Sequence, residues 1–418
     1  MPENWKTYKL KEAANLSTGF AFKSKDYRNT GDLKVIRGKN ITEGFLRWGE
    51  DSRYWNFSME KLDKYAVEEG DIVVGMDGSK IGKNRAIVRS QDLPSILAQR
   101  VGRINAKSEI AEQKFLWQLI NNKIFEDYIN NVKTGTSIPH ISLTQIGNFE
   151  IELPPREEQK SIASILSALD DKIELNLQMN KTLEEMAMAL YKHWFVDFGP
   201  FQDGEFMDSE FGEIPKGWEV KELKDLIQLN PRLSLKKGSE ASFVEMKVLP
   251  IDVMSVSDVV QKEFKGGSKF QNGDTLFARI TPCLENGKTA FVDFLEPGEI
   301  AFGSTEFLVM RTKEGVSKYW TYCLARDTNF RNFAISTMVG TSGRQRVQND
   351  PFLSYEIPQP PKEIFDSFSE ISEPWFQLIR INTIENKTLT QLRDTLLPKL
   401  ISGEVRVKDV EKTLTEVL

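Results

Sequence analysis

Cations, amides and hydroxyl groups gather in turn-like stretches between the β-like runs of both halves of the chain. Guanidinium and amide groups form paired hydrogen bonds in a fixed fork, which is the geometry that distinguishes base edges, while lysine and hydroxyl groups suit phosphate. In the first half the candidates are Lys23, Lys25, Arg28, Arg37, Lys39, Asn40, Lys80, Lys83, Asn84, Arg85, Lys133, Thr136, Ser137 and His140. In the second half they are Arg279, Thr281, Asn286, Lys288, Ser304, Thr305, Thr341, Ser342, Arg344, Gln345, Arg346 and Gln348. The sequence thus offers two sets of candidate DNA-binding residues.

Each of these residues, taken singly, is more often a solvated surface group than a reader of bases. A cluster of such residues therefore supports the DNA-binding hypothesis better than any single residue does. The stretch GTSGRQRVQ is the best such cluster, because its Gly, Thr and Ser can place backbone and hydroxyl donors near phosphate while its Arg and Gln reach bases.

The sequence lacks the common catalytic and nucleotide-binding motifs. There is no GxxxxGK[ST], GxGxxG, HExxH or GxSxG motif and no NPPY-like tetrapeptide, so ATP hydrolysis and methyl transfer by this chain are disfavoured. The two histidines, His140 and His193, would need the fold to bring them together before they could share a catalytic role. Cys283 and Cys323 have no His or Cys partner nearby and are expected to be thiols in the interior. We therefore predict no catalytic residue, no metal site and no cofactor bound by the chain itself.

The composition is that of an ordinary water-soluble protein of 418 residues, with 40% hydrophobic and 28% charged residues. The N-terminal stretch has no basic-then-apolar signal, and no apolar run approaches the length of a membrane span, so we expect a cytoplasmic protein without a membrane partner. The net charge is −6 overall, and it is +3 for residues 1–153, −3 for 154–199, −4 for 200–358 and −2 for 359–418. If DNA is the ligand, local loops or a partner must supply much of the positive field.

The second half of the sequence repeats the first in order, at a shift of about 205 residues. The matched segments are PENWKTYKL with PKGWEVKEL, EGDIVV with NGDTLF, TGTS with VGTS, and NKTL with NKTL. Collinear matches at a nearly constant shift indicate a tandem duplication.

A heptad pattern follows each globular half. The first seam is Ile162, Leu169, Asn176, Leu183 and Leu190, and the same phase 206 residues later is Phe368, Trp375, Asn382, Leu389 and Leu396. Such a pattern predicts two long helices that bury their seams against each other, and the alternative is that each helix packs separately onto its own domain. In an antiparallel pair, Asn176 and Asn382 could come close together and fix the register, or both could face solvent.

The fold class expected from these patterns is α+β. Short β-like runs and a following helical pattern make each half a mixed domain, and the two long helices join the halves as an antiparallel coiled coil. The boundaries are residues 1–153 for the first domain, 154–199 for the first long helix, 200–358 for a linker and the second domain, and 359–418 for the second long helix and a C-terminal tail.

The chain resembles the DNA-specificity (S) subunits of type I restriction–modification systems. The stretches that carry the resemblance are PPREEQKSIASILSALDDKIELN, LYKHWFVDF, SEFGEIPKGWEV, GDTLFARITPCLENGKTAFV, FGSTEFLVMR, GTSGRQRV and LLPKLISGEVRV, which spread over almost the whole chain. The resemblance implies two target-recognition domains that each read one part of a split, asymmetric site in double-stranded DNA. It implies no catalytic residue in this chain.

The resemblance also implies partners. Two methyltransferase (M) subunits, which carry S-adenosylmethionine and methylate adenine, would dock on the long helices, and restriction (R) subunits would supply the ATP- and Mg-dependent motor and nuclease. The second helix begins PPKEIFDSF and lacks the EEQ of the first, which puts strict equivalence of the two docking surfaces in doubt. The alternative from another class is a coiled-coil scaffold whose globular ends bind proteins rather than a specific DNA sequence.

Overall fold

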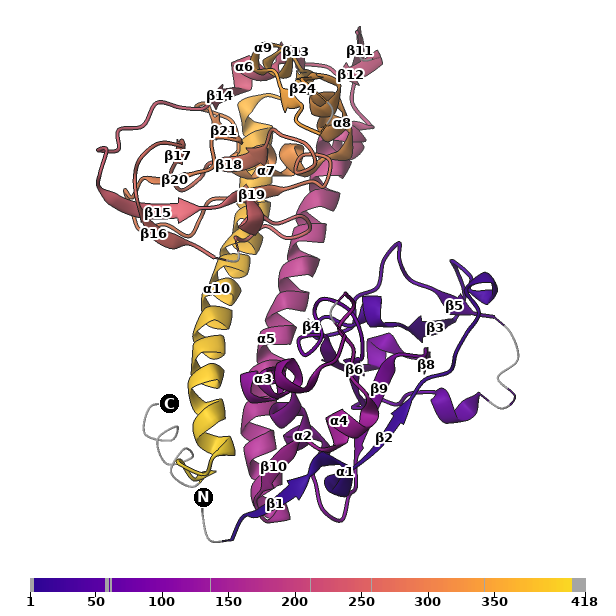
Figure 1. The fold of residues 1–418 in the computed structure, drawn as a ribbon. Helices are drawn as coiled ribbons and strands as arrows, with labels where there is room; N and C mark the ends of the chain where they lie inside the picture. The colour runs from indigo at the N-terminus through magenta and orange to yellow at the C-terminus, as the bar shows by residue number, and fades with distance from the viewer. Residues whose placement is uncertain are drawn as a thin grey trace. The chain divides into compact units, whose positions relative to one another are not determined.

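The computed structural model describes residues 4–56, 60, 62–135, 137–210, 212–256, 258–341 and 343–407 (Figure 1). The chain forms two compact units: unit 1 comprises Met1–Lys172 and Leu389–Leu418, and unit 2 comprises Ile173–Thr388. The chain passes from one unit to the other inside each long helix, so both helices contribute to both units.

Unit 1 begins with a mixed α+β domain. Its elements are β1 (Lys6–Lys9), α1 (Leu10–Ala13), β2 (Ala14–Thr18), β3 (Leu33–Ile36), β4 (Glu43–Gly44), β5 (Tyr54–Trp55), β6 (Ile72–Gly75), β7 (Arg85–Ile87), β8 (Ser95–Leu97), β9 (Val101–Ala106), α2 (Gln113–Ile120), α3 (Lys123–Val132), α4 (Leu143–Gly147) and β10 (Glu150–Leu153). One sheet has the order β2-β9-β6-β7-β4, a second has the order β5-β3-β8, and β1 pairs with β10. The core lies between the larger sheet and helices α2 and α3, where Ile72, Phe115 and Phe125 are fully buried.

Unit 2 contains the second mixed domain. Its elements are β11 (Phe206–Ser209), β12 (Gly212–Pro215), β13 (Glu219–Glu222), α6 (Leu223–Leu226), β14 (Ile227–Leu229), β15 (Glu240–Val244), β16 (Val260–Glu263), β17 (Ser268–Phe270), β18 (Thr275–Ala278), β19 (Thr289–Phe291), β20 (Ala301–Gly303), β21 (Phe307–Thr312), α7 (Lys318–Arg326), α8 (Thr328–Ser336), β22 (Met338–Val339), β23 (Arg346–Val347), α9 (Asn349–Leu353) and β24 (Glu356–Gln359). The stretch expected to be a linker holds the β11–β12 hairpin, which its Gly- and Pro-rich composition did not reveal.

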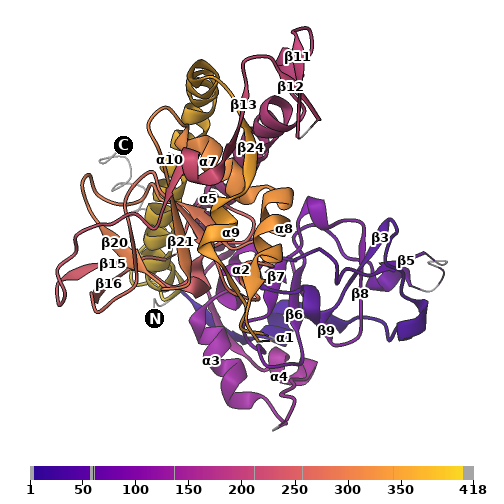
Figure 2. The same ribbon diagram turned by 90° about the horizontal axis from the view of Figure 1, so that it is seen from above.

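The two domains share their topology. The order β14-β21-β18-β19 repeats β2-β9-β6-β7, and the pair β13–β24 repeats β1–β10. Figure 2 labels β6 and β9 of the first of these sheets and β21 of the second. In each second sheet a strand pairs in parallel, β3 with β8 and β15 with β20. Strand order in space thus follows the sequence duplication.

The repeated Gly-Asp motif is structural. Gly70 and Gly273 have φ angles of 87° and 92°, which glycine adopts without strain. In unit 1 the Asp71 carboxylate pairs with Arg103 at 2.7 Å and accepts a hydrogen bond from Asn105 at 2.7 Å. In unit 2 the Asp274 carboxylate accepts two hydrogen bonds from Arg311, both at 2.7 Å, and its burial raises its pKa. A buried carboxylate with a cationic partner therefore fixes the same turn in each half.

Helix capping interrupts the helical pattern that follows each sheet. The helical pattern that follows the β-like runs of the first half forms two helices, α2 and α3, rather than one. They are separated because the Asn122 side chain accepts a hydrogen bond from the backbone N–H of Phe125 at 3.1 Å. The Asp327 side chain caps α8 in the same way, through the N–H of Phe330 at 3.0 Å. The same break therefore occurs in both halves.

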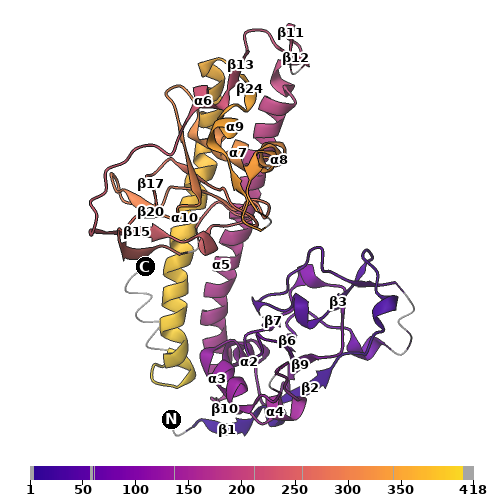
Figure 3. The ribbon, with the colours of Figure 1, turned by 45° about the horizontal axis from the view of Figure 1, so that its top comes forward.

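The long helices are α5 (Arg156–Tyr191), which continues into a π-helical turn over Lys192–Val196, and α10 (Lys362–Ile401). They run side by side in Figures 1 and 3. They are antiparallel, because Asn176 of α5 contacts Asn386 of α10, whereas Asn180, one turn further along α5, contacts Asn382, one turn earlier in α10. Two long helices packed together were predicted from the heptads, and the structure confirms them.

Four asparagines connect the helices inside unit 2. The Asn176 amide donates to the Asn386 side-chain oxygen at 2.9 Å, and the Asn382 amide donates to the Asn180 side-chain oxygen at 2.8 Å. These two bonds are equivalent under the 206-residue shift. Asn176 and Asn382 are 0% and 4% exposed, so they do not face solvent; each pairs with the asparagine of the opposite NKTL motif rather than with the other.

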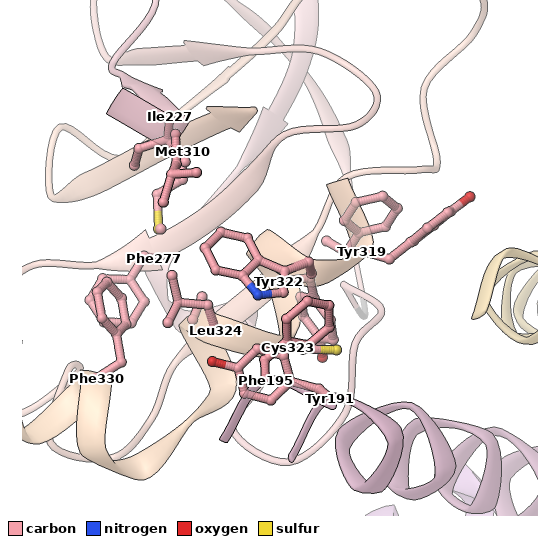
Figure 4. Close-up of a cluster of buried hydrophobic side chains, with 14 of the residues drawn as sticks. Tyr191, Phe195, Ile227, Phe277, Met310, Tyr319, Tyr322, Cys323, Leu324 and Phe330 are labelled. Atoms are coloured by element: carbon pink, nitrogen blue, oxygen red, sulfur yellow. The ribbon is translucent and has the colours of Figure 1, made fainter. Parts of the chain in front are cut away.

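The end of α5 joins the core of unit 2 rather than ending in solvent. Leu183 and Tyr191 are buried, and Phe195 stacks on Phe365 with ring centroids 5.8 Å apart. Figure 4 shows Tyr191 and Phe195 within this core. Buried Glu184 accepts a hydrogen bond from the Tyr322 hydroxyl and lies 3.6 Å from the Arg326 guanidinium. Ile162, near the start of α5, belongs to the core of unit 1. The helix therefore pairs with α10 and also packs onto a domain at each end, so both alternatives drawn from the heptad pattern hold in part.

Candidate nucleic-acid interface

Three loops of unit 1 meet beyond the larger sheet, and their described residues are 76–84, 98–100, 133–135 and 137–141. Backbone hydrogen bonds hold them together: the N–H of Met76 donates to Arg100 at 2.9 Å, Ile141 donates to Met76 at 2.9 Å, and Gly78 donates to Pro139 at 3.0 Å. We call these loops loop cluster 1.

Unit 2 has the same arrangement in residues 279–288, 304–306, 339–341 and 343–348, which we call loop cluster 2. The N–H of Arg279 donates to Glu306 at 3.0 Å, Val347 donates to Arg279 at 2.9 Å, and Thr281 donates to Gln345 at 3.1 Å. Each bond joins positions equivalent to a bond in loop cluster 1. The two clusters therefore have equivalent backbone structures.

Side chains at equivalent positions of the two clusters differ in chemistry. Arg100 corresponds to Glu306, and His140 corresponds to Arg346; His140 and Arg346 each form a bridge to the loop beside them. In loop cluster 1 the His140 ring nitrogen Nε2 lies 3.0 Å from the Thr134 hydroxyl. In loop cluster 2 the Arg346 guanidinium lies against the Glu306 carboxylate, and these hydrogen bonds raise the pKa of Arg346.

Arg100 is a functional candidate that the sequence did not single out. It is exposed and has a φ angle of 72°, a left-handed conformation that costs a non-glycine residue roughly 1 kcal/mol or more. Strain of this kind concentrates at functional sites. Only alignment of the two halves, which places Arg100 opposite Glu306, could have drawn attention to it from sequence.

A cavity of about 480 Å³ opens beside Arg100. Its lining combines cations, amides and aromatic rings: Phe22, Tyr27, Arg37, Gly38, Lys39, Asp77, Gly78, Ser79, Lys80, Asn84, Ala98, Gln99 and Arg100. Arg37, Lys39, Lys80 and Asn84 were predicted from sequence, so the fold brings four of the predicted residues of the first half to one hollow.

Burial removes three predicted residues from the candidate interface. Asn40 is 1% exposed and its amide donates to the carbonyl of Arg47 at 3.2 Å. Arg85 is 7% exposed and donates to the carbonyl of Gly82 and to the Asn121 side chain, and burial lowers its pKa. The hydroxyl of Thr281, which is also buried, accepts from the N–H of Gln345 at 3.1 Å. These expectations are corrected: the polar groups serve the fold.

Two further cations bind backbone carbonyl groups. Arg279 donates to Val347 at 2.6 Å, and the Lys288 ammonium donates to Met246 at 2.6 Å. The Arg279 bond joins two loops of loop cluster 2, and the Lys288 bond ties the cluster to the segment around Met246, so both side chains have structural partners within the chain.

Most other predicted residues lie on the surface. The exposed ones are Lys23, Lys25, Arg28, Lys39, Lys80, Lys83, Lys133, Ser137, His140, Asn286, Thr305, Thr341, Arg344 and Arg346, and the partly exposed ones are Arg37, Asn84, Ser304, Gln345 and Gln348. Thr136 and Ser342 lie outside the described residues. Lys83 is within 4.0 Å of Glu43 and Glu126, and Lys39 is 3.9 Å from Asp51, so these two lysines have acidic neighbours.

None of the helices in the described part of the chain combines the length and apolar character that a membrane span requires.

Comparison with protein families gives two matches to one model, the type I restriction modification DNA specificity domain, over residues 2–185 and 215–394. The double match confirms the duplication predicted from sequence. The chain is 27% identical to the type I restriction enzyme MjaIX specificity subunit of Methanocaldococcus jannaschii, over 98% of this chain and 95% of that protein. It is 24% identical to the HindI specificity subunit of Haemophilus influenzae, over 96% and 100%.

Among solved structures, the fold matches the crystal structure of a type I restriction–modification S subunit from M. genitalium. The TM-score is 0.59 at 16% identity, and the match covers 95% of this chain and 96% of the other. At this identity the likeness concerns the fold.

Proposed function

The chain belongs to the DNA-specificity subunits of type I restriction–modification systems, the non-catalytic part of those enzymes, and we propose that loop clusters 1 and 2 each read one part of a split DNA site. The observation that carries this proposal is the pair of equivalent loop clusters, which have the same backbone hydrogen bonds and different exposed side chains. Two similar frames with different side chains suit a site whose two parts differ in sequence.

Loop cluster 1 offers the fuller set of contacts. Around the cavity, the cations of Lys80 and Arg100 in loop cluster 1, and those of Arg37 and Lys39 beside it, suit phosphate or guanine. The amide of Gln99 can bond an adenine edge. The target sequence itself depends on how these exposed side chains meet the duplex.

Two methyltransferase (M) subunits are the partners we propose for the long helices. Apolar side chains are exposed at equivalent places on both: Leu175 on α5 is 53% exposed and Ile381 on α10 is 59% exposed. Exposed apolar groups of this kind mark protein interfaces when they cluster, and one turn along the same helix faces Met179 and Ile384 are 38% and 55% exposed. A surface that occurs twice suits two copies of one partner.

The EEQ stretch bears on this docking. Gln159 is 1% exposed and its side-chain oxygen accepts a hydrogen bond from the N–H of Glu112 at 2.8 Å. The equivalent Phe365 is also buried. The first repeat has a glutamine and the second a phenylalanine at this position, but both side chains are buried. This difference therefore does not alter the exposed faces on which we propose that the M subunits dock.

In this proposal S-adenosylmethionine belongs to the M subunits, and ATP with Mg belongs to restriction (R) subunits that join the complex. The cationic surface of these partners would add to a chain whose own net charge is −6.

Selection from a randomised duplex pool tests the DNA part of the proposal. The full chain with its co-expressed M subunit should enrich one split sequence with two specified parts and an unspecified spacer. A scaffold without sequence-specific binding, the alternative class, would enrich no sequence and would contradict the proposal.

Stoichiometry tests the partner part. Leu175→Asp and Ile381→Asp, each alone, should reduce the complex from two M subunits to one, because a buried aspartate without a partner opposes docking. Lys181→Asp, at an exposed polar position on another face of α5, is the matched control and should keep two. Native mass spectrometry measures the ratio, and two bound M subunits in both aspartate variants would contradict the proposed surfaces.

A further inference from the structure

The ion pair in loop cluster 2 uses one edge of the Arg346 guanidinium. Its Nε–H donates to both carboxylate oxygens of Glu306 at 3.0 Å, and its NH2 group donates to Oε1 at 2.8 Å. A guanidinium carries five N–H groups in one plane. The edge formed by NH1 and the second hydrogen of NH2 therefore remains as a parallel fork.

The backbone on both sides of Arg346 is held in place. The N–H of Gln345 donates to the Thr281 hydroxyl at 3.1 Å, and the N–H of Val347 donates to the carbonyl of Arg279 at 2.9 Å. The side chain of Arg346 is 44% exposed, and that of Glu306 is 23% exposed. In loop cluster 2 the backbone beside Arg346 and one edge of its guanidinium are therefore fixed, while the other edge is accessible. Because the side chain is already held in one conformation, little rotamer freedom is lost on binding.

We infer that Glu306 positions Arg346 to donate two parallel hydrogen bonds to one guanine in the part of the DNA site read by loop cluster 2. The fork spacing of a guanidinium matches the O6 and N7 acceptors of guanine in the major groove. Arg346 would then be the specificity-determining residue and Glu306 its positioning residue. The inference rests on the proposed function of the loop clusters.

A base edge suits this arrangement better than a phosphate does. The Glu306 carboxylate lies about as close to Arg346 as a phosphate oxygen would, so its negative charge would repel a phosphate arriving beside it. A guanine edge carries no net charge and presents two acceptors. The carboxylate therefore favours the neutral ligand.

Loop cluster 1 cannot place a guanidinium in this way. Arg100 replaces Glu306 and His140 replaces Arg346, so neither position supplies a carboxylate. The inference consequently concerns one part of the split site only.

The experiment is selection from a randomised duplex pool by the full chain with its co-expressed M subunit, which gives base preferences position by position. Wild type should require guanine at one position of one part of the site. Arg346→Ala should lower that preference about 10- to 100-fold and leave every other position unchanged. Arg346→Lys should lose it as well, because an ammonium has no fork.

Two further variants separate positioning from structure. Glu306→Gln keeps one acceptor oxygen and should reduce the guanine preference at the same position by less than Arg346→Ala does. Arg232→Ala, which removes an exposed arginine of unit 2 outside loop cluster 2, is the matched control and should keep the preference.

The outcomes distinguish this inference from the function on which it rests. If wild type enriches no split sequence, the proposed function fails. If wild type enriches one, but Arg346→Ala weakens binding to all sequences equally, Arg346 contacts phosphate and the inference is overturned. A Glu306→Gln variant with unchanged preferences would overturn the role of Glu306.

Discussion

Arg100 and His140 of the first half occupy the positions that Glu306 and Arg346 occupy in the second, on loops joined by the same backbone hydrogen bonds. Below the surface the halves agree closely: each has a buried aspartate that fixes the Gly-Asp turn and a polar cap that separates the two helices after the sheet. The two halves therefore share the buried residues that determine the backbone structure, whereas their exposed loop residues differ in charge and hydrogen-bonding groups. The following predictions test how far that agreement extends.

The largest effect is expected at the buried aspartates. Asp71→Ala and Asp274→Ala should each lower the free energy of unfolding by about 3 kcal/mol, because each removes a buried carboxylate and leaves a partly buried arginine without its partner. Chemical denaturation measures the loss, with exposed Asp203→Ala as the control. A loss below about 1 kcal/mol in only one half would break the claim of a shared frame.

A difference between the halves is expected in pH dependence. Burial raises the pKa of Asp293 from 3.8 to about 6, and the nearby cation of Arg380 offsets this only in part; the equivalent residue of the first half is Arg89. Because the folded state holds the proton more tightly, this carboxyl stabilises the protein below pH 4 relative to neutral pH, and that contribution is lost as pH rises through about 6.

Asp293→Asn should therefore remove a pH-dependent change in unfolding free energy of about 3 kcal/mol between pH 4 and pH 7. The measurement is denaturation of variant and wild type across that range, with Asp203→Asn as the control. Parallel stability curves for wild type and Asp293→Asn would contradict the prediction.

The asparagines of the helix pair should differ in their contribution to stability. Asn180→Leu removes the side-chain acceptor of the buried Asn382 amide and should cost about 1–3 kcal/mol of unfolding free energy. Asn386→Leu should cost less, because the Asn176 amide also donates to the Glu385 carboxylate at 2.7 Å. Thermal denaturation checks this, and unchanged stability in either variant would show that its bond contributes nothing to helix pairing.

The smallest effect is expected for a single phosphate contact. Lys80→Ala removes an exposed cation beside the cavity of loop cluster 1 and should weaken binding to all sequences alike, reducing the slope of log affinity against log salt by about 1. Lys83→Ala should change the slope less, because Glu43 and Glu126 already neutralise that lysine. Equal slopes for wild type and Lys80→Ala would exclude the contact.

The sequence predicted the architecture better than the surface. The heptads and the duplication predicted the paired helices and the two α+β halves, because hydrophobic periodicity and Gly-Asp turns are local signals. Burial of Asn40, Arg85 and Thr281 depends on tertiary contacts with Arg47, Asn121 and Gln345, which no local pattern records. Arg100 was missed because its importance arises from its backbone conformation and from its equivalence to Glu306.

The measurement that tests the central claim most directly is a domain exchange read by methylome sequencing. Residues 1–153 would be replaced by the corresponding segment of a related specificity subunit, and the chimera would be expressed with the M subunit of this chain. We predict that one part of the methylated split sequence changes while the other part stays the same. Methylation of an unchanged sequence, or a change in both parts, would contradict the claim that each half reads its own part of the site.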